Sequence, residues 1–167
     1  MTATEAQAKI LYFIHQIDRP GTADLEEFIR KSNYLTTAKC HGHHKGIYGL
    51  MFHSLEVLDI MLKFNWLGLP QESIIIVALC HDLGKATIAG TKSGQGKHPD
   101  KSLFILERCG FQLTIAERRA IEYHHLGKHM KSFFSAITNP LQQLLHLGDC
   151  MSTGLDKKGK PYEFRII

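Results

Sequence analysis

The chain has 167 residues, of which 44% are hydrophobic and 22% charged, values that fit one globular domain and argue against a disordered or fibrous protein. Its apolar runs are shorter than the roughly 20 residues needed to span a bilayer, and its first residues lack the basic start and long apolar core of a secretion signal. The net charge of +4 suits an anionic substrate but does not by itself indicate nucleic-acid binding.

The cysteines and histidines give a first indication of environment and chemistry. Four cysteines lie far apart without a CxxC pair, which predicts reduced thiols in a cytoplasmic protein. Eleven histidines are many for a chain of this length, and several fall in or beside predicted helices.

Hydrophobic residues recur mostly at helical spacing, and strictly alternating runs are scarce, so we predict an all-α fold. The first helix is expected at residues 4–17. The second is expected at 23–31, with Thr22 as its N-cap. Residues 32–49 are rich in glycine and histidine and predict a loop. A third helix is expected at 50–65, with an apolar stripe along one face.

The apolar stretch at 74–80 lies directly before a histidine and an aspartate. Its β-branched content alone would also fit a buried strand. Pro70 near the start and Glu72 in the first turn favour a helix. We expect Gly84 to end this helix.

Three further helices are predicted in the second half of the chain. Pro99 at a first helical position begins one that runs to about residue 109. The capping box TIAE at 114–117 begins the next, which is expected to continue through His125. The pair Asn139-Pro140 begins the last helix.

Histidines and carboxylates form four clusters, each in a predicted helix or at its end. The clusters are His53 in LMFHSLEV, His81 with Asp82 in CHDLGK, His124 with His125 in EYHHLGKH, and Asp149 in HLGDCM. His124 falls on the apolar side of its helix, whereas Glu117 falls on the opposite side. A single histidine of this kind is more often a hydrogen-bonded core residue than a ligand. A divalent metal would satisfy the whole set at once, because each separate buried polar group would cost stability.

The order His53, His81-Asp82, Asp149 resembles the H…HD…D signature of the HD-domain metal-dependent phosphohydrolases. CHDLGKA is similar to the most diagnostic segment of that superfamily. The resemblance implies a single compact HD-domain helical bundle.

The resemblance also divides the chain. It covers about residues 40–152, which would form the HD core. The N-terminal helices at 1–39 would precede this core and a tail at 153–167 would follow it, within one structural domain.

The segment HHKGIYGLMFHSLEV is similar to the H…GGLLEHS stretch of phage and bacterial HD proteins of unassigned role and of HD 3′-5′ exoribonucleases. Tyr48 replaces the first glycine of the pair, and Phe52 replaces the acidic residue before the histidine, which weakens an exoribonuclease assignment. His43 matches the histidine that precedes the glycine pair. The resemblance therefore implies that His43 binds a substrate phosphate, although a surface loop rich in histidine is an equal alternative.

Some HD subfamilies, including those that hydrolyse cyclic dinucleotides, hold two metals with an added histidine, often before proline, and then an HH pair. This chain has KHPDKSLFIL and EYHH in that order. By this resemblance Asp82 would bridge two ions. The first would be held also by His53, His81 and Asp149, and the second by His98, His124 and His125. Such a nitrogen-rich set suits Fe, Mn, Co, Ni or Zn better than Mg.

The resemblance implies hydrolysis of a phosphomonoester or phosphodiester in a nucleotide or short oligonucleotide by a metal-activated water. Asp82 would orient the metals, and Lys85 would contact the substrate and neutralise charge on the phosphoryl group. Lys85 could instead be a solvated lysine favoured by the helix dipole. Two other functions remain open: an HD-domain di-iron oxygenase, or a non-catalytic metal-stapled nucleotide-binding module.

Overall fold

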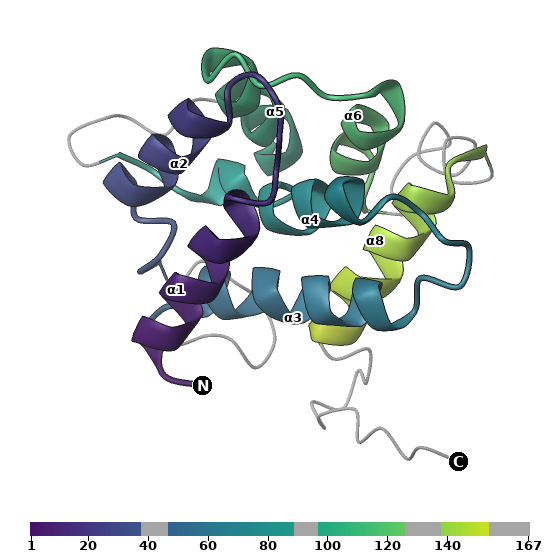
Figure 1. Ribbon diagram of the computed structural model, residues 1–167, viewed down its shortest axis with the longest axis horizontal. Helices are drawn as coiled ribbons and strands as arrows, with labels where there is room; N and C mark the ends of the chain where they lie inside the picture. Colours follow the sequence, from purple (N-terminus) through teal and green to yellow (C-terminus); the bar gives the residue numbers. More distant parts are fainter. Residues whose placement is uncertain (38–46, 89–96, 126–137, 154–167) are drawn as a thin grey trace.

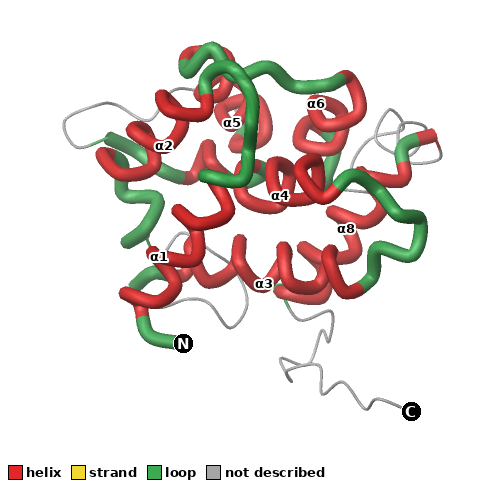
Figure 2. Tube along the Cα trace, viewed as in Figure 1, coloured by secondary structure: helices red, strands yellow, loops and turns green. Residues whose placement is uncertain are grey.

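The computed structural model describes residues 1–37, 47–88, 97–125 and 138–153. These residues form seven α-helices, a short 3-10 helix and no strand, in one compact bundle (Figure 2). The all-α prediction is confirmed. None of the helices in these ranges is long and apolar enough to cross a membrane.

Each predicted helix is present, with ends that differ by a few residues. The elements in chain order are α1 (Ala3–Ile14), α2 (Thr22–Lys31), α3 (Gly49–Lys63), α4 (Gln71–Cys80), the 3-10 helix η1 (Leu83–Lys85), α5 (His98–Arg108), α6 (Ile115–Glu122) and α8 (Pro140–Ser152).

Helix α4 is the centre of the bundle (Figure 1). Every residue from Ser73 to Cys80 is buried, and α1, α3, α6 and α8 all pack against this helix. A helix that is apolar on all sides is stable only inside a core, which explains why this stretch shows no helical amphipathic pattern. The buried helix delivers the residues that follow it, His81 and Asp82, to the interior.

The prediction that Gly84 ends α4 was wrong. The helix ends at Cys80 with His81 as its C-cap, and Gly84 lies inside η1. Helix α5 approaches this glycine so closely that a Cβ atom there would lie 2.2 Å from the carbonyl oxygen of His98 and 2.6 Å from Cβ of Lys101. Gly84 is therefore required for close packing of η1 against α5.

Two other local predictions were wrong. Helix α6 ends at Glu122, so the histidine pair lies beyond the helix and not within it. The N-cap of α2 is Gly21 with φ 84°, and not Thr22, whose hydroxyl instead donates to the carbonyl of Arg19 at 2.8 Å.

Glu117 is buried, contrary to the expectation that it faces away from the apolar side. Its carboxylate accepts a hydrogen bond from the Arg19 guanidinium at 2.6 Å and from the Ser73 hydroxyl at 2.6 Å. It also accepts from the backbone of Thr114 in the predicted capping box. These partners compensate for the cost of burying the charge.

The last helix packs closely against α3. The side chain of Asn139 accepts from the backbone of Gln142 and caps α8, as predicted. A Cβ on Gly148 would lie 3.2 Å from the carbonyl oxygen of Val57 and 3.1 Å from Cγ of Met61. The glycine thus allows the close approach that brings Asp149, the next residue, to α3.

Candidate metal centre

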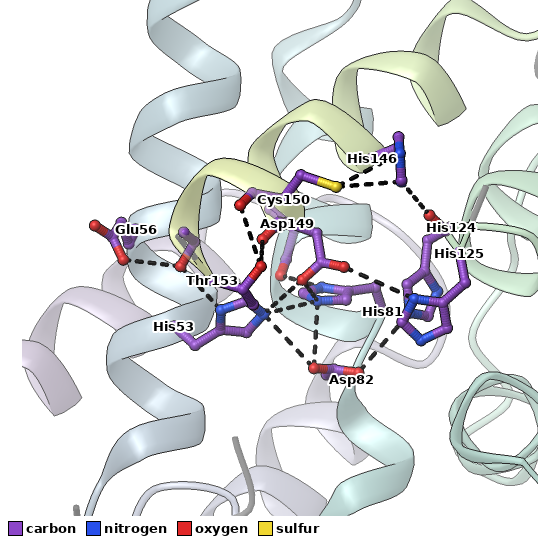
Figure 3. Close-up of polar contacts among 12 residues, drawn as sticks. His53, Glu56, His81, Asp82, His124, His125, His146, Asp149, Cys150 and Thr153 are labelled. Carbon is purple, nitrogen blue, oxygen red and sulfur yellow. Dashed lines mark hydrogen bonds and ion pairs between the residues drawn. The ribbon is translucent and has the colours of Figure 1, made fainter. Parts of the chain in front are cut away.

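The predicted ligands come from separate elements and lie close together, and Figure 3 labels each of them except His98. His53 lies within α3 and Asp149 within α8, so each is held by a helix. The others lie at helix ends: His81 and Asp82 follow α4, His98 begins α5, and His124 and His125 follow α6. The structure brings together all seven residues for which the sequence predicted a metal site.

The first group of ligands surrounds Nε2 of His53. This atom lies 3.2 Å from Nε2 of His81, 3.1 Å from Oδ1 of Asp149 and 3.6 Å from Oδ2 of Asp82. Nε2 of His81 lies 3.5 Å from the same Asp82 oxygen. Two imidazoles and two carboxylates therefore direct one atom each toward a common point, as the ligands of a cation would.

The second group consists of three histidines. Nε2 of His98 lies 3.3 Å from Nε2 of His124 and 3.0 Å from Nε2 of His125. The other oxygen of Asp82, Oδ1, lies 3.1 Å from His98 and 3.9 Å from His124. Ligand atoms of these three histidines lie within 4.8 Å of one another, which is close enough to hold a metal ion.

Asp82 lies between the two groups and is only 1% exposed. Its oxygen Oδ2 faces His53 and His81, whereas Oδ1 faces His98 and His124. Although burial alone would raise the pKa of Asp82, the nearby His81, His98 and Lys85 hold it well below its usual value. The residue is therefore a carboxylate, and Oδ1 makes no hydrogen bond of good geometry with the described part of the chain.

Hydrogen bonds behind the rings orient three of the histidines. Nδ1 of His81 contacts the carbonyl oxygen of Ala78 at 3.0 Å, and Nδ1 of His124 contacts that of Ile121 at 2.7 Å. A carbonyl only accepts, so Nδ1 carries the proton in each ring and Nε2 presents its lone pair to the centre. Nδ1 of His53 contacts a side chain, the hydroxyl of Ser152, at 2.9 Å.

Burial also keeps His81 and His125 neutral. It lowers the pKa of His81 to about 3. Burial together with His124 and His98 lowers the pKa of His125 to about 4. For Asp149, burial would raise the pKa, but the nearby His53 and His81 hold it below its usual value. Neutral imidazoles and ionised carboxylates are the forms that bind metals.

Lys85 lies beside this centre and forms an ion pair with Oδ2 of Asp82. Its side chain is 16% exposed, so it is not the solvated lysine of the alternative interpretation. The backbone turn of η1 directs this ammonium group back toward the carboxylate three residues earlier.

The structure adds residues that sequence reasoning missed. Ser152 and Glu56 lie behind His53, and the carbonyl of His124 contacts Nδ1 of His146 at 2.9 Å. Ser152 and Glu56 each follow a predicted ligand by three residues on a helix, a spacing that could have indicated them. The predicted substrate contact His43 lies outside the described residues, together with His41 and His44.

The donor set fits divalent cations. Two ionised carboxylates, at Asp82 and Asp149, lie among imidazole rings whose nitrogens converge, and one buried carboxylate oxygen lacks a well-formed hydrogen bond. This combination costs stability in the absence of a positive charge, and a cation supplies that charge.

The comparisons with known proteins agree with this interpretation. The model of the HD domain family matches residues 50–161, which is more than half of the chain. No curated protein and no solved structure matches the chain significantly.

Proposed function

This chain belongs to the HD domain family, most of whose members are metal-dependent phosphohydrolases, and we propose that it cleaves a phosphomonoester or phosphodiester of a nucleotide or short oligonucleotide. The attacking group would be a water activated by divalent transition metals, two ions of Fe, Mn, Co, Ni or Zn. The substrate class is thus a phosphorylated small molecule or short nucleic acid.

One observation carries the proposal of two cations: the two oxygens of Asp82 face different ligand groups. The carboxylate would bridge the two ions. His53, His81 and Asp149 would hold the first ion, and His98, His124 and His125 the second. A pair of bound cations lowers the pKa of a shared water and neutralises charge on phosphate oxygens.

Lys85 supports hydrolysis further. Its ammonium group lies at the same carboxylate as the metal ligands and is partly exposed. From there it would stabilise negative charge that develops on the phosphoryl oxygens. His43 stays a predicted phosphate contact.

The alternatives share this ligand set. A di-iron oxygenase would use the same histidines and carboxylates for a reaction that consumes oxygen. A metal-stapled nucleotide-binding module would need the metal for stability alone. The adjacent pair His124-His125 and the lysine of HDLGK favour hydrolysis.

The test starts from protein stripped with a chelator and reloaded with each of Mn²⁺, Fe²⁺, Co²⁺, Ni²⁺ and Zn²⁺. Turnover is measured without oxygen on nucleoside monophosphates, cyclic dinucleotides and short oligonucleotides. We expect metal-dependent hydrolysis that is lost in His98→Gln. His15→Gln is the matched control, because His15 is exposed and pairs with Glu26 away from the centre.

Two results would contradict the proposal. Activity that requires oxygen would identify an oxygenase. A large drop in melting temperature on chelation, with no turnover of any phosphoester, would leave the stapled module.

A further inference from the structure

Behind His53 lies a chain of polar groups that the sequence did not indicate. The hydroxyl of Ser152 lies 2.9 Å from Nδ1 of His53 and donates to Oε2 of Glu56 at 2.8 Å. His53 and Ser152 are fully buried, and Glu56 is partly buried. Figure 3 shows Glu56 beyond His53, on the side away from Asp82.

The direction of these hydrogen bonds follows from the proton count. A carboxylate only accepts, so the single hydroxyl proton of Ser152 is used in the bond to Glu56. The Ser152 oxygen is then left to accept, and it accepts from an N–H at Nδ1 of His53. A proton of the ring is thereby held at Nδ1, and Nε2 is the nitrogen that faces Asp149 and Asp82.

We propose that Glu56 and Ser152 are positioning residues that hold a proton at Nδ1 of His53, so that Nε2 is the nitrogen that binds at the first metal site. The inference rests on the proposed metal site. His81 and His124 obtain the same tautomer from backbone carbonyls. In His53 the same task falls to side chains, so it can be removed by mutation.

Helices α3 and α8 each supply one predicted ligand and, three residues later, one supporting residue. On α3, Glu56 follows His53 by three residues, and on α8, Ser152 follows Asp149 by three. Residues three apart lie on the same helix face. The packing of α8 on α3 therefore sets two contacts together: Nε2 of His53 with Oδ1 of Asp149, at 3.1 Å, and Nδ1 of His53 with Ser152.

The hydrogen-bonded chain Glu56–Ser152–His53, called the relay below, predicts a different local change for each of its two supporting residues. In Ser152→Ala the ring loses its acceptor. In Glu56→Ala the serine stays but its proton is released, so the hydroxyl can donate to Nδ1 and favour the tautomer with the proton at Nε2. In both variants we expect metal affinity to fall about 10- to 100-fold, as is usual when a metal-ligating histidine loses its supporting partner.

The experiment measures the tautomer directly by ¹⁵N NMR of histidine-labelled, metal-free protein at pH 8. The signal of His53 is identified as the one that is missing in His53→Gln. Wild type should show a proton at Nδ1. Ser152→Ala and Glu56→Ala should lose this proton and shift population to the tautomer protonated only at Nε2, which can donate to Asp149. Glu56→Gln keeps an acceptor oxygen and should retain the wild-type tautomer. Binding of Zn²⁺ and Mn²⁺ is measured in parallel by chelator competition.

Ser54→Ala is the matched control, because this buried serine is the neighbour of His53 on α3 and makes no hydrogen bond to a histidine of the centre within the described residues. It should leave both tautomer and affinity unchanged. A tautomer that stays at Nδ1–H in both Ser152→Ala and Glu56→Ala would overturn the relay. Failure of wild type to bind metal would overturn the proposed function, whereas the NMR result would still decide the relay.

Discussion

At the scale of single residues, the centre depends most on Asp82. This carboxylate is 1% exposed and contacts both ligand groups through different oxygens. No neutral side chain can replace it, because an amide offers one acceptor oxygen and carries no charge. The residue was found from sequence because the dipeptide His81-Asp82 ends an apolar helix, where an isolated charge would be costly.

Asp82→Asn is expected to lower metal affinity about 100-fold or more, because one ligand oxygen and the negative charge are both lost. The measurement is metal content per chain by mass spectrometry after dialysis. Asp59→Asn is the matched control, since Asp59 is exposed and pairs with Lys9. Wild-type metal content in Asp82→Asn would contradict the bridging role.

At the scale of elements, helix ends carry most of the site. The capping box at Thr114 and the Asn139 cap were predicted correctly, because these signals are local. The role of Gly84 was not predicted, because it depends on α5, whose approach the sequence around Gly84 does not encode. The position of Glu117 was missed for the same reason: its partner Arg19 is 98 residues away.

Gly84→Ala is expected to destabilise the fold by about 1–3 kcal/mol, the usual cost of forcing extra atoms into a packed core. The added methyl group would press on the His98 carbonyl and displace the start of α5. Metal affinity should fall as well, because His98 lies at the displaced start of α5. Urea denaturation and chelator competition measure the two effects.

Gly68→Ala provides the comparison. A Cβ at Gly68 would meet nothing within 4 Å, although its φ is +62°. It should cost about 1 kcal/mol through backbone strain alone and leave metal affinity unchanged. Equal stability of Gly84→Ala and wild type would show that α5 can move away without cost.

At the scale of the whole molecule, two ion pairs of Arg19 connect the N-terminal helices to the rest of the bundle. Arg19 follows α1 and pairs with Glu72 at 2.7 Å and with Glu117 at 2.6 Å. It thereby joins the start of the chain to α4 and α6. The division at residues 39 and 40 stays a prediction, but the segment before it is packed against the core and not appended to it.

Glu117→Gln is expected to lower stability by about 1–3 kcal/mol at pH 7, the value of a buried charged hydrogen bond. Burial would raise the pKa of Glu117, but hydrogen bonds from Arg19 and Ser73 lower it below its usual 4.5. A carboxyl group whose pKa is lower in the folded than in the unfolded state stabilises the fold at pH values above the unfolded pKa. This contribution is lost as the pH falls through the folded pKa.

The difference between wild type and Glu117→Gln should therefore be full at pH 7 and shrink as pH falls below about 4.5. Urea denaturation between pH 3 and pH 7 measures it. Glu27→Gln, which removes an exposed pair with Lys31, should change stability by less than about 1 kcal/mol. A difference that stays constant across this pH range would contradict the assignment.

The placement of the ligands on helices far apart in the sequence has a kinetic consequence. His53 on α3 meets Asp149 on α8 only after the helices between them in sequence have packed. In the unfolded chain these side chains are not held together, so a cation finds few ligands in reach before the helices have packed. Cation binding would then slow the unfolding of the finished bundle and leave the rate of folding largely unchanged.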